Sequence, residues 1–155
     1  MISKNIFYSV LACLFLLSAA SQAVSQEDFI KERKSLMRSN DRTVKAIRKA
    51  VKQDDFAAIE ASAKLIVADM DKLLALFPKG STSEKSRAKA EIWEDWDSFS
   101  KKSLAAKTAA EELAKIAAAK DSEQLGPKIK ALGTSRAGAC GSCHMTFRAR
   151  SKRKR

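Results

Sequence analysis

The strongest constraint on the fold is the helical spacing of apolar residues, which starts at Gln26 and continues almost to the end of the chain. Between Gln26 and about Lys52 there is no proline or glycine, and apolar residues recur every seven positions. They are Ile30, Met37, Val44 and Val51. This spacing places apolar side chains on one face of an α-helix. The segment is predicted to be amphipathic and helical, and no part of the chain shows a competing strand pattern.

Three further helices are predicted: residues 56–77, closed by Pro78, the alanine-rich stretch 96–120, and residues 127–150. Residues 78–95 form one long connection, interpreted as an ordered crossover, and residues 121–127 form a short break. Gly133 and Gly138 weaken the helical pattern inside the last segment. Helices of similar length with two short links and one long link favour an all-α, antiparallel up-down-up-down four-helix bundle.

The first 23 residues have the three-part pattern of a secretory signal peptide: Lys4, an apolar run over residues 6–17, and small residues up to Ala23. The apolar run is shorter than the roughly 20 residues that a spanning helix needs. We therefore expect cleavage near Ala23, rather than a retained membrane anchor, and export to the periplasm. The mature chain is expected to comprise one domain over residues 24–150 and a basic tail over residues 151–155.

A cluster of chemically active residues, Cys140-Gly141-Ser142-Cys143-His144, lies near the C-terminus. Two thiols at this spacing can form thioethers to one haem, and the histidine that follows can bind its iron. His144 is the sole histidine in the sequence, which excludes bis-histidine coordination. A redox disulfide and a zinc site are the alternatives, but the first would follow a strand and the second needs a fourth ligand. The sequence predicts one covalent haem c, which would also fill a thin, alanine-rich core.

Two methionines are candidates for the opposite face of the iron. At about 1.5 Å per residue, Met37 lies roughly 18 Å into its predicted helix and His144 roughly 10 to 15 Å from the end of its own. Met70 falls at nearly the same height, whereas Met145 adjoins His144. Height does not choose between Met37 and Met70, and both also occupy apolar positions where methionine is ordinary core packing.

The C-terminal segment, residues 140–148, resembles the ending of the cytochrome c′ family, the class II cytochromes c. Residues 33–38, 75–78 and 87–95 match the family in the expected order. The resemblance extends over nearly all of the mature chain and implies a four-helix bundle with haem near its C-terminus. It also assigns roles to particular side chains: Cys140 and Cys143 for haem attachment, His144 as proximal ligand, and Met37 at the distal position.

Four other residues would lie around the haem by the same resemblance: Arg33 at its edge, Arg148 on the proximal side, and Trp93 and Phe147 as aromatic packing. A solvated helix position is the alternative for both arginines, and ordinary core packing is the alternative for both aromatic residues.

The family has two kinds of member. In low-spin members a first-helix methionine ligates the iron and electron transfer is implied, whereas high-spin members keep a five-coordinate iron that binds nitric oxide or carbon monoxide. The run around Met37 looks more like the low-spin kind, so the predicted function is electron transfer with Met37 as sixth ligand. Gas binding is the alternative. An enzyme is not expected, because there is no distal histidine for acid–base chemistry.

The charge balance indicates an anionic partner. The chain has 30 Lys and Arg against 18 Asp and Glu, a formal net charge of +12, and much of the excess lies in residues 148–155. An exported protein rarely meets nucleic acid, so an acidic redox partner or anionic lipid fits better. A solvated tail without a partner is the alternative. An exposed stripe on the first two helices fits either a homodimer or an ordinary core.

Overall fold

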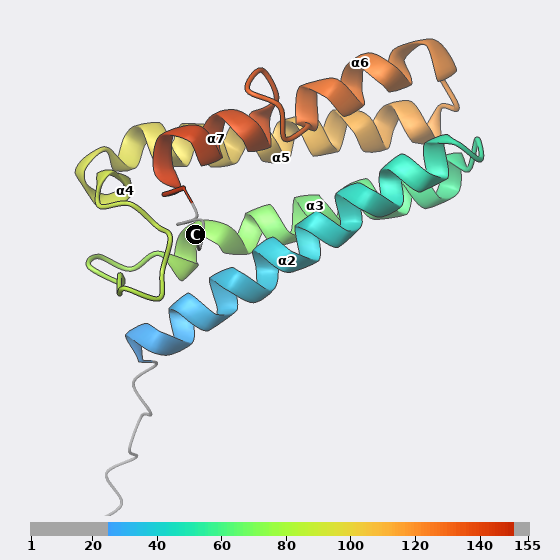
Figure 1. Cartoon of the computed structure of the whole chain (residues 1–155). Helices are drawn as coiled ribbons and strands as arrows, with labels where there is room; N and C mark the ends of the chain where they lie inside the picture. Colours follow the sequence, from blue (N-terminus) through green and yellow to red (C-terminus); the bar gives the residue numbers. More distant parts are fainter. Residues whose placement is uncertain (1–24, 151–155) are drawn as a thin grey trace, which may run out of the picture.

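The computed structural model describes residues 25–150, so the predicted signal peptide and the tail over residues 151–155 lie outside the described part. Its elements are α2 (Gln26–Val51), α3 (Phe56–Leu73), the 3₁₀ helix η1 (Leu74–Leu76), α4 (Glu91–Glu94), α5 (Trp96–Ala118), α6 (Ser122–Leu132) and α7 (Ala139–Phe147). Figure 1 shows α2 and α3 as one hairpin, with α5 running beside α6 and α7 as the second. The prediction of an all-α four-helix bundle is confirmed, with α6 and α7 together forming the fourth helix.

Polar side chains set where the main helices begin. The caps are Ser25 for α2, Asp55 for α3, Asp95 for α5 and Asp121 for α6. Each side-chain oxygen accepts a hydrogen bond from a backbone N–H in the first turn, which satisfies a donor that has no partner inside the helix. Ser25 forms a full capping box with Asp28, because the Asp28 carboxylate also accepts a hydrogen bond from the Ser25 backbone.

The core is built where α3 packs on α5, the most extensive helix pair of the bundle. Small alanines lie fully inside this contact, among them Ala63 on α3 and Ala110 on α5, and they allow the two backbones to approach closely. Larger side chains fill the remaining space: Ile47, Ile59, Ile66 and Leu113 are all at most 2% exposed. The alanine-rich composition therefore serves close helix packing as well as helix propensity.

The last helix differs from the sequence prediction. The structure has two helices there, and the chain leaves the helical path over residues 133–138. The predicted break at 121–127 is also wrong, because Asp121 caps α6 and helix starts at Ser122, with Pro127 inside α6. The helix that was expected to continue to residue 150 ends at Phe147. The last turn before Pro78 is likewise a 3₁₀ turn rather than α-helix.

The connection between η1 and α5 is ordered, as predicted. Its residues 87–89 run antiparallel to residues 147–149, the segment that follows α7, with Ala88 and Arg148 forming an isolated β-bridge. The backbone N–H of Lys89 donates to the Phe147 carbonyl at 3.1 Å, and the N–H of Ala149 donates to the Arg87 carbonyl at 2.8 Å. Across residues 25–150, no helix is both long enough and apolar enough to cross a membrane.

Candidate functional site

The predicted haem-binding motif lies on α7, which packs on α5. Cys140 and Cys143 are partly buried, pack against the hydrophobic core and are not joined by a disulfide. His144 follows in the same helix and is also partly buried. The structure therefore brings the three predicted residues together on one short helix at the edge of the core.

Burial sets the protonation state of these groups. It raises the pKa of Cys140, and it raises the pKa of Cys143 to about 11. Both side chains are therefore thiols near neutral pH, unlike the thiolate of a reactive redox pair. Burial lowers the pKa of His144, and the positive charges of Arg148 and Arg87 lower it further. His144 is thus held neutral, which is the form of imidazole that binds a metal.

The described residues do not favour a zinc site. Between residues 25 and 150 there is no group of three or more His, Cys, Asp or Glu side chains placed to hold a metal ion. The zinc alternative needs such a cluster, with four ligands around the ion. The thiol pair and His144 therefore fit covalent attachment of a larger group better than a compact metal site.

Backbone packing fixes the start of α7. A Cβ atom on Gly141 would lie 1.8 Å from the carbonyl oxygen of Ser135, and a Cβ on Gly138 would lie 2.2 Å from that of Gly133. The N–H of Gly141 also donates to the Gly133 carbonyl at 3.2 Å. The loop over residues 133–138 thus presses directly on the turn that carries both thiols. Glycine between the cysteines is a steric requirement here that the motif alone does not reveal.

The other end of α7 is held by the crossover. The Lys89 ammonium donates to the Thr146 carbonyl at 2.8 Å and pairs with Glu91 at 2.7 Å. A cation at this position satisfies a carbonyl that the helix leaves unpaired at its C-terminus. The Arg87 guanidinium donates to the Ala149 carbonyl at 2.9 Å. Sequence inspection missed this support, because backbone pairing leaves no signature in residue type.

Arg33 is buried at 4% exposure, so the alternative of a solvated helix position is wrong for this residue. Its guanidinium donates to the hydroxyl and the carbonyl of Ser81 and lies 4.4 Å from the centre of the Phe77 ring. Among the residues described, no carboxylate lies within ion-pair distance of it. Arg33 thus ties α2 to the crossover through Ser81, a partner that its turn sequence did not single out.

The two predicted aromatic residues belong to one cluster at this end of the bundle. Phe147 packs edge-on against Phe99, with ring centres 5.3 Å apart, and Phe99 packs in turn on Phe77 at 4.8 Å. Trp93 lies 6.4 Å from Phe77, and its indole N–H donates to the carbonyl oxygens of Phe77 and Pro78. The cluster joins the end of η1, the helix α4 and the end of α7 to the start of α5. Arg148, in contrast, is exposed.

The candidate distal residues differ in their surroundings. Met37 on α2 is partly buried and packs against the core, whereas Met70 on α3 is a core residue at 8% exposure. Asn40, one turn beyond Met37, has a side-chain oxygen that is buried without a hydrogen-bond partner among the described residues. Buried polar atoms in proteins are nearly always paired. An unpaired one beside Met37 fits a site that receives a further group, such as the predicted haem.

Comparisons with known proteins point to one family. The Cytochrome C′ family profile matches residues 28–148. A cytochrome c′ of Rhodospirillum rubrum is 34% identical over 135 residues, which are 85% of this chain and 89% of that protein. A cytochrome c-556 of Agrobacterium fabrum is 31% identical over 137 residues, 88% of this chain and 86% of that protein.

Solved structures show the same fold. A cytochrome c′ with ligand-controlled dimer dissociation superposes with a TM-score of 0.73 at 25% identity, over 83% of this chain and 99% of that one. A nitric oxide complex of a cytochrome c prime variant from Alcaligenes xylosoxidans superposes with a TM-score of 0.73 at 25% identity, over 84% and 100% of the two chains.

Proposed function

Because the chain belongs to the cytochrome c′ family, whose cofactor is a covalent haem c, we propose that it carries single electrons in the periplasm. In this proposal Cys140 and Cys143 hold the haem and His144 is the proximal ligand, with Met37 as the distal ligand. When bound, haem supplies a one-electron iron centre. The observation that carries the proposal is the position of Met37, partly buried on α2 against the same core that Cys140 and Cys143 contact.

The protein's own residues have separate tasks in this proposal. Burial raises the pKa of both partly buried thiols, so they are protonated near neutral pH, and neutral His144 offers a nitrogen lone pair without losing a proton first. The partly buried thioether of Met37 is a soft, neutral donor, and methionine opposite histidine raises the reduction potential. The contacts of Lys89 and of the crossover backbone with the end of α7 support the helix that carries His144.

The test is a pair of conservative substitutions read by absorption spectroscopy. Met37→Leu removes the sulfur with little change in volume, and Met70→Leu is the matched control in the core of α3. We expect the wild-type protein and the Met70→Leu variant to show a low-spin ferrous spectrum and a ferric sulfur-to-iron band in the near infrared. Met37→Leu should lose that band and gain a response to carbon monoxide. A wild-type protein that is already high-spin and binds carbon monoxide would overturn Met37 ligation.

Gas binding is the second candidate function. It is favoured by the nitric oxide complex of the structural neighbour described above, and relatives named cytochrome c′ and cytochrome c-556 match this chain at similar identity. In this alternative Met37 lines the distal side without binding iron. Tight binding of nitric oxide or carbon monoxide by the wild-type ferrous protein would put this function in place of electron transfer.

The remaining proposals concern location, assembly and turnover. We propose a signal peptide that is cleaved near Ala23, a single domain over residues 24–150 and an acidic redox partner, without enzymatic turnover. N-terminal sequencing of the protein from a periplasmic extract tests the cleavage. Measurable consumption of added peroxide or nitric oxide would contradict a carrier role.

A homodimer is also proposed, because a structural neighbour is a dimer whose dissociation is ligand-controlled. Sedimentation with and without carbon monoxide tests it.

A further inference from the structure

Charge is distributed unevenly over the bundle. The helix α2 carries eight basic and four acidic residues, and residues 77–90 of the crossover carry four basic residues and one acidic residue. The helices α3 and α5 together carry six of each. Several of these charges on α3 and α5 are paired with each other, including Lys64 with Glu60 and Lys107 with Asp71. The positive charge of the folded part is therefore concentrated on α2, the crossover and the C-terminal end of α7.

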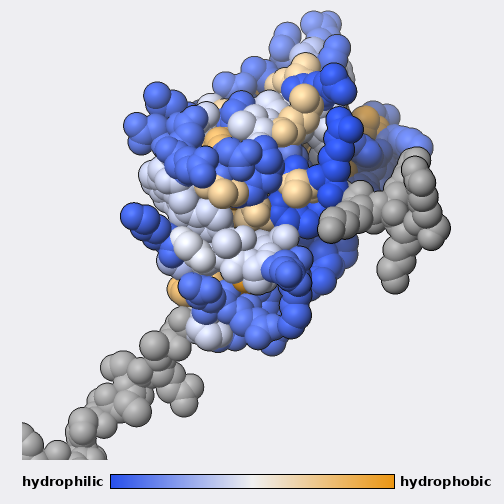
Figure 2. All heavy atoms as spheres, turned by 60° about the vertical axis from the view of Figure 1, so that its left-hand side comes forward, coloured by the Kyte–Doolittle hydropathy of each residue, from blue (hydrophilic) through white to orange (hydrophobic). Residues whose placement is uncertain are grey.

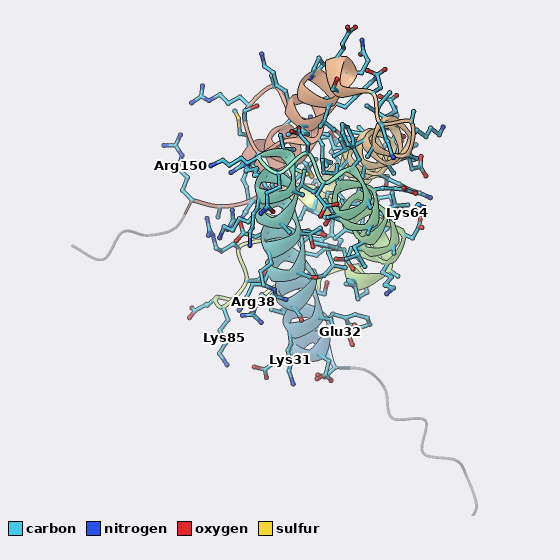
Figure 3. The ribbon with its side chains drawn as sticks, turned by 90° about the vertical axis from the view of Figure 1, so that its right-hand side faces the viewer. Lys31, Glu32, Arg38, Lys64, Lys85 and Arg150 are labelled. Atoms are coloured by element: carbon cyan, nitrogen blue, oxygen red, sulfur yellow. The ribbon has the colours of Figure 1, made fainter. Side chains whose placement is uncertain are left out.

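These basic segments are joined into one surface, which we call the basic face. A groove of about 410 Å³ is lined by Lys31, Lys34 and Arg38 of α2 together with Lys85 of the crossover. The backbone pairing of residues 87–89 with 147–149 then connects the crossover to Arg148 and Arg150. Figure 3 shows Arg38, Lys85 and Arg150 on the same side of the molecule, with Lys64 of α3 on the other side.

The two carboxylates that line the groove, Glu27 and Asp28, are already engaged. Glu27 pairs with Lys85 at 3.1 Å, and Asp28 is held in the capping box with Ser25. Lys31, Lys34 and Arg38 are exposed, and within residues 25–150 none of them forms an ion pair. Figure 2 shows the adjoining end of the molecule as largely hydrophilic, with apolar residues only in small groups. The surface is thus suited to charge recognition rather than to a large apolar interface.

We propose that the basic face is the docking surface for a partner protein that presents an acidic patch. The proposal rests on the electron-transfer function and names the partner class and the residues that recognise it. Met37 lies on the same helix as Lys34 and Arg38, three residues after the first and one before the second, so docking here brings the partner to the side of α2 next to the proposed distal ligand. Long-range attraction of this kind raises the rate of encounter and is weakened by salt.

The first experiment maps binding on the holoprotein. Ferrous, ¹⁵N-labelled protein is titrated with a short polyglutamate peptide, and amide shifts are followed by NMR. We expect the largest shifts over residues 27–38, 85–89 and 147–150, and their loss when salt is raised. Shifts spread evenly over the bundle, or centred on α3 and α5, would overturn the proposal.

The second experiment compares two triple variants that remove the same net charge. Lys31→Gln/Lys34→Gln/Arg38→Gln changes the basic face, and the control Lys72→Gln/Lys101→Gln/Lys115→Gln changes exposed lysines of α3 and α5. The probe is the rate of oxidation of the ferrous protein by hexacyanoferrate(III). At about 10 mM ionic strength we expect a roughly tenfold loss for the basic-face variant and less than about threefold for the control. Equal losses in the two variants would refute a localised surface.

Two further results distinguish a docking surface for a protein from two alternatives, recognition by the tail and binding to a membrane. Both variants keep residues 151–155, so a loss confined to the basic-face variant assigns recognition to the folded face rather than to the tail. Binding of wild-type protein to phosphatidylglycerol vesicles that the basic-face variant loses, without NMR shifts from polyglutamate, would replace the protein partner by a membrane. The absorption spectrum of each variant should stay that of wild type. Failure of Met37 ligation would appear in that spectrum and not in the titration, so the two proposals fail separately.

Discussion

Replacing Gly141 by alanine tests how tightly the loop before α7 holds the motif. The new Cβ would lie 1.8 Å from the Ser135 carbonyl oxygen, about half of an ordinary contact distance. Both partners are backbone, so the loop or the helix must move. Relief of such a clash typically costs about 1–3 kcal/mol. Loss of the Gly141 to Gly133 hydrogen bond adds about 1 kcal/mol, and the better helix propensity of alanine returns about the same amount.

We therefore expect Gly141→Ala to lower the free energy of unfolding by about 1–3 kcal/mol. For a domain of this size the thermal midpoint should fall by roughly 3–10 °C. Gly126→Ala is the matched control, because Gly126 lies in α6 and a Cβ added there would meet nothing within 4 Å. It should stabilise the protein by about 0.5–1 kcal/mol through helix propensity.

The assay is urea unfolding followed by circular dichroism on holoproteins of equal haem content. The decisive result is whether the free energy of unfolding is lower for Gly141→Ala than for Gly126→Ala. If Gly141→Ala is as stable as Gly126→Ala, the Ser135 carbonyl does not press on α7, and the steric account of the loop over residues 133–138 is refuted.

Three further substitutions test other contacts. Arg33→Lys loses the forked donation to Ser81 and should destabilise the protein by about 1–3 kcal/mol in urea unfolding, and an unchanged midpoint would show that the buried guanidinium is not needed. Trp93→Phe removes the indole N–H that donates to two carbonyl oxygens and should cost about 1–2 kcal/mol by the same assay. In the haem-free protein the folded state binds a proton on His144 less readily than the unfolded chain, because the pKa of His144 is lowered from 6.5. The associated stability is full above about pH 6.5 and is lost as the pH falls from there toward the folded pKa, and His144→Gln should flatten that part of the pH profile.

The sequence was sufficient for the features that depend on local pattern. The seven-residue spacing from Ile30 to Val51 predicted α2 to within a residue, because the apolar stripe and the polar face are both written in residue type. The motif at Cys140 and Cys143 predicted attachment chemistry for the same reason. Arg33 was singled out by resemblance to the family, and its burial now gives the position a physical reason.

Features that depend on contacts between distant segments were not predicted. Gly133 and Gly138 weakened the helical pattern, but nothing local showed that Gly138 packs against the Gly133 backbone and Gly141 against that of Ser135, where the helix is interrupted. The break expected at 121–127 failed because a cap at Asp121 outweighs a proline five residues inside α6. The unpaired, buried side-chain oxygen of Asn40 was also not predicted, because the lack of a hydrogen-bond partner depends on the positions of surrounding residues in the folded structure.

Because the crossover pairs with the segment after α7, the bundle is completed late in folding. Arg87 and Ala149 are 62 positions apart, and contacts at such separations form slowly because the entropy of closing the loop must be overcome first. In a chain that emerges from its N-terminus, α2, α3 and the crossover are made before their C-terminal partner arrives. We expect the thiols of Cys140 and Cys143 to be most accessible for attachment after α7 has been made and before the segment that follows it pairs with the crossover. Pairing of residues 87–89 with residues 147–149 would then close the period in which haem can be attached.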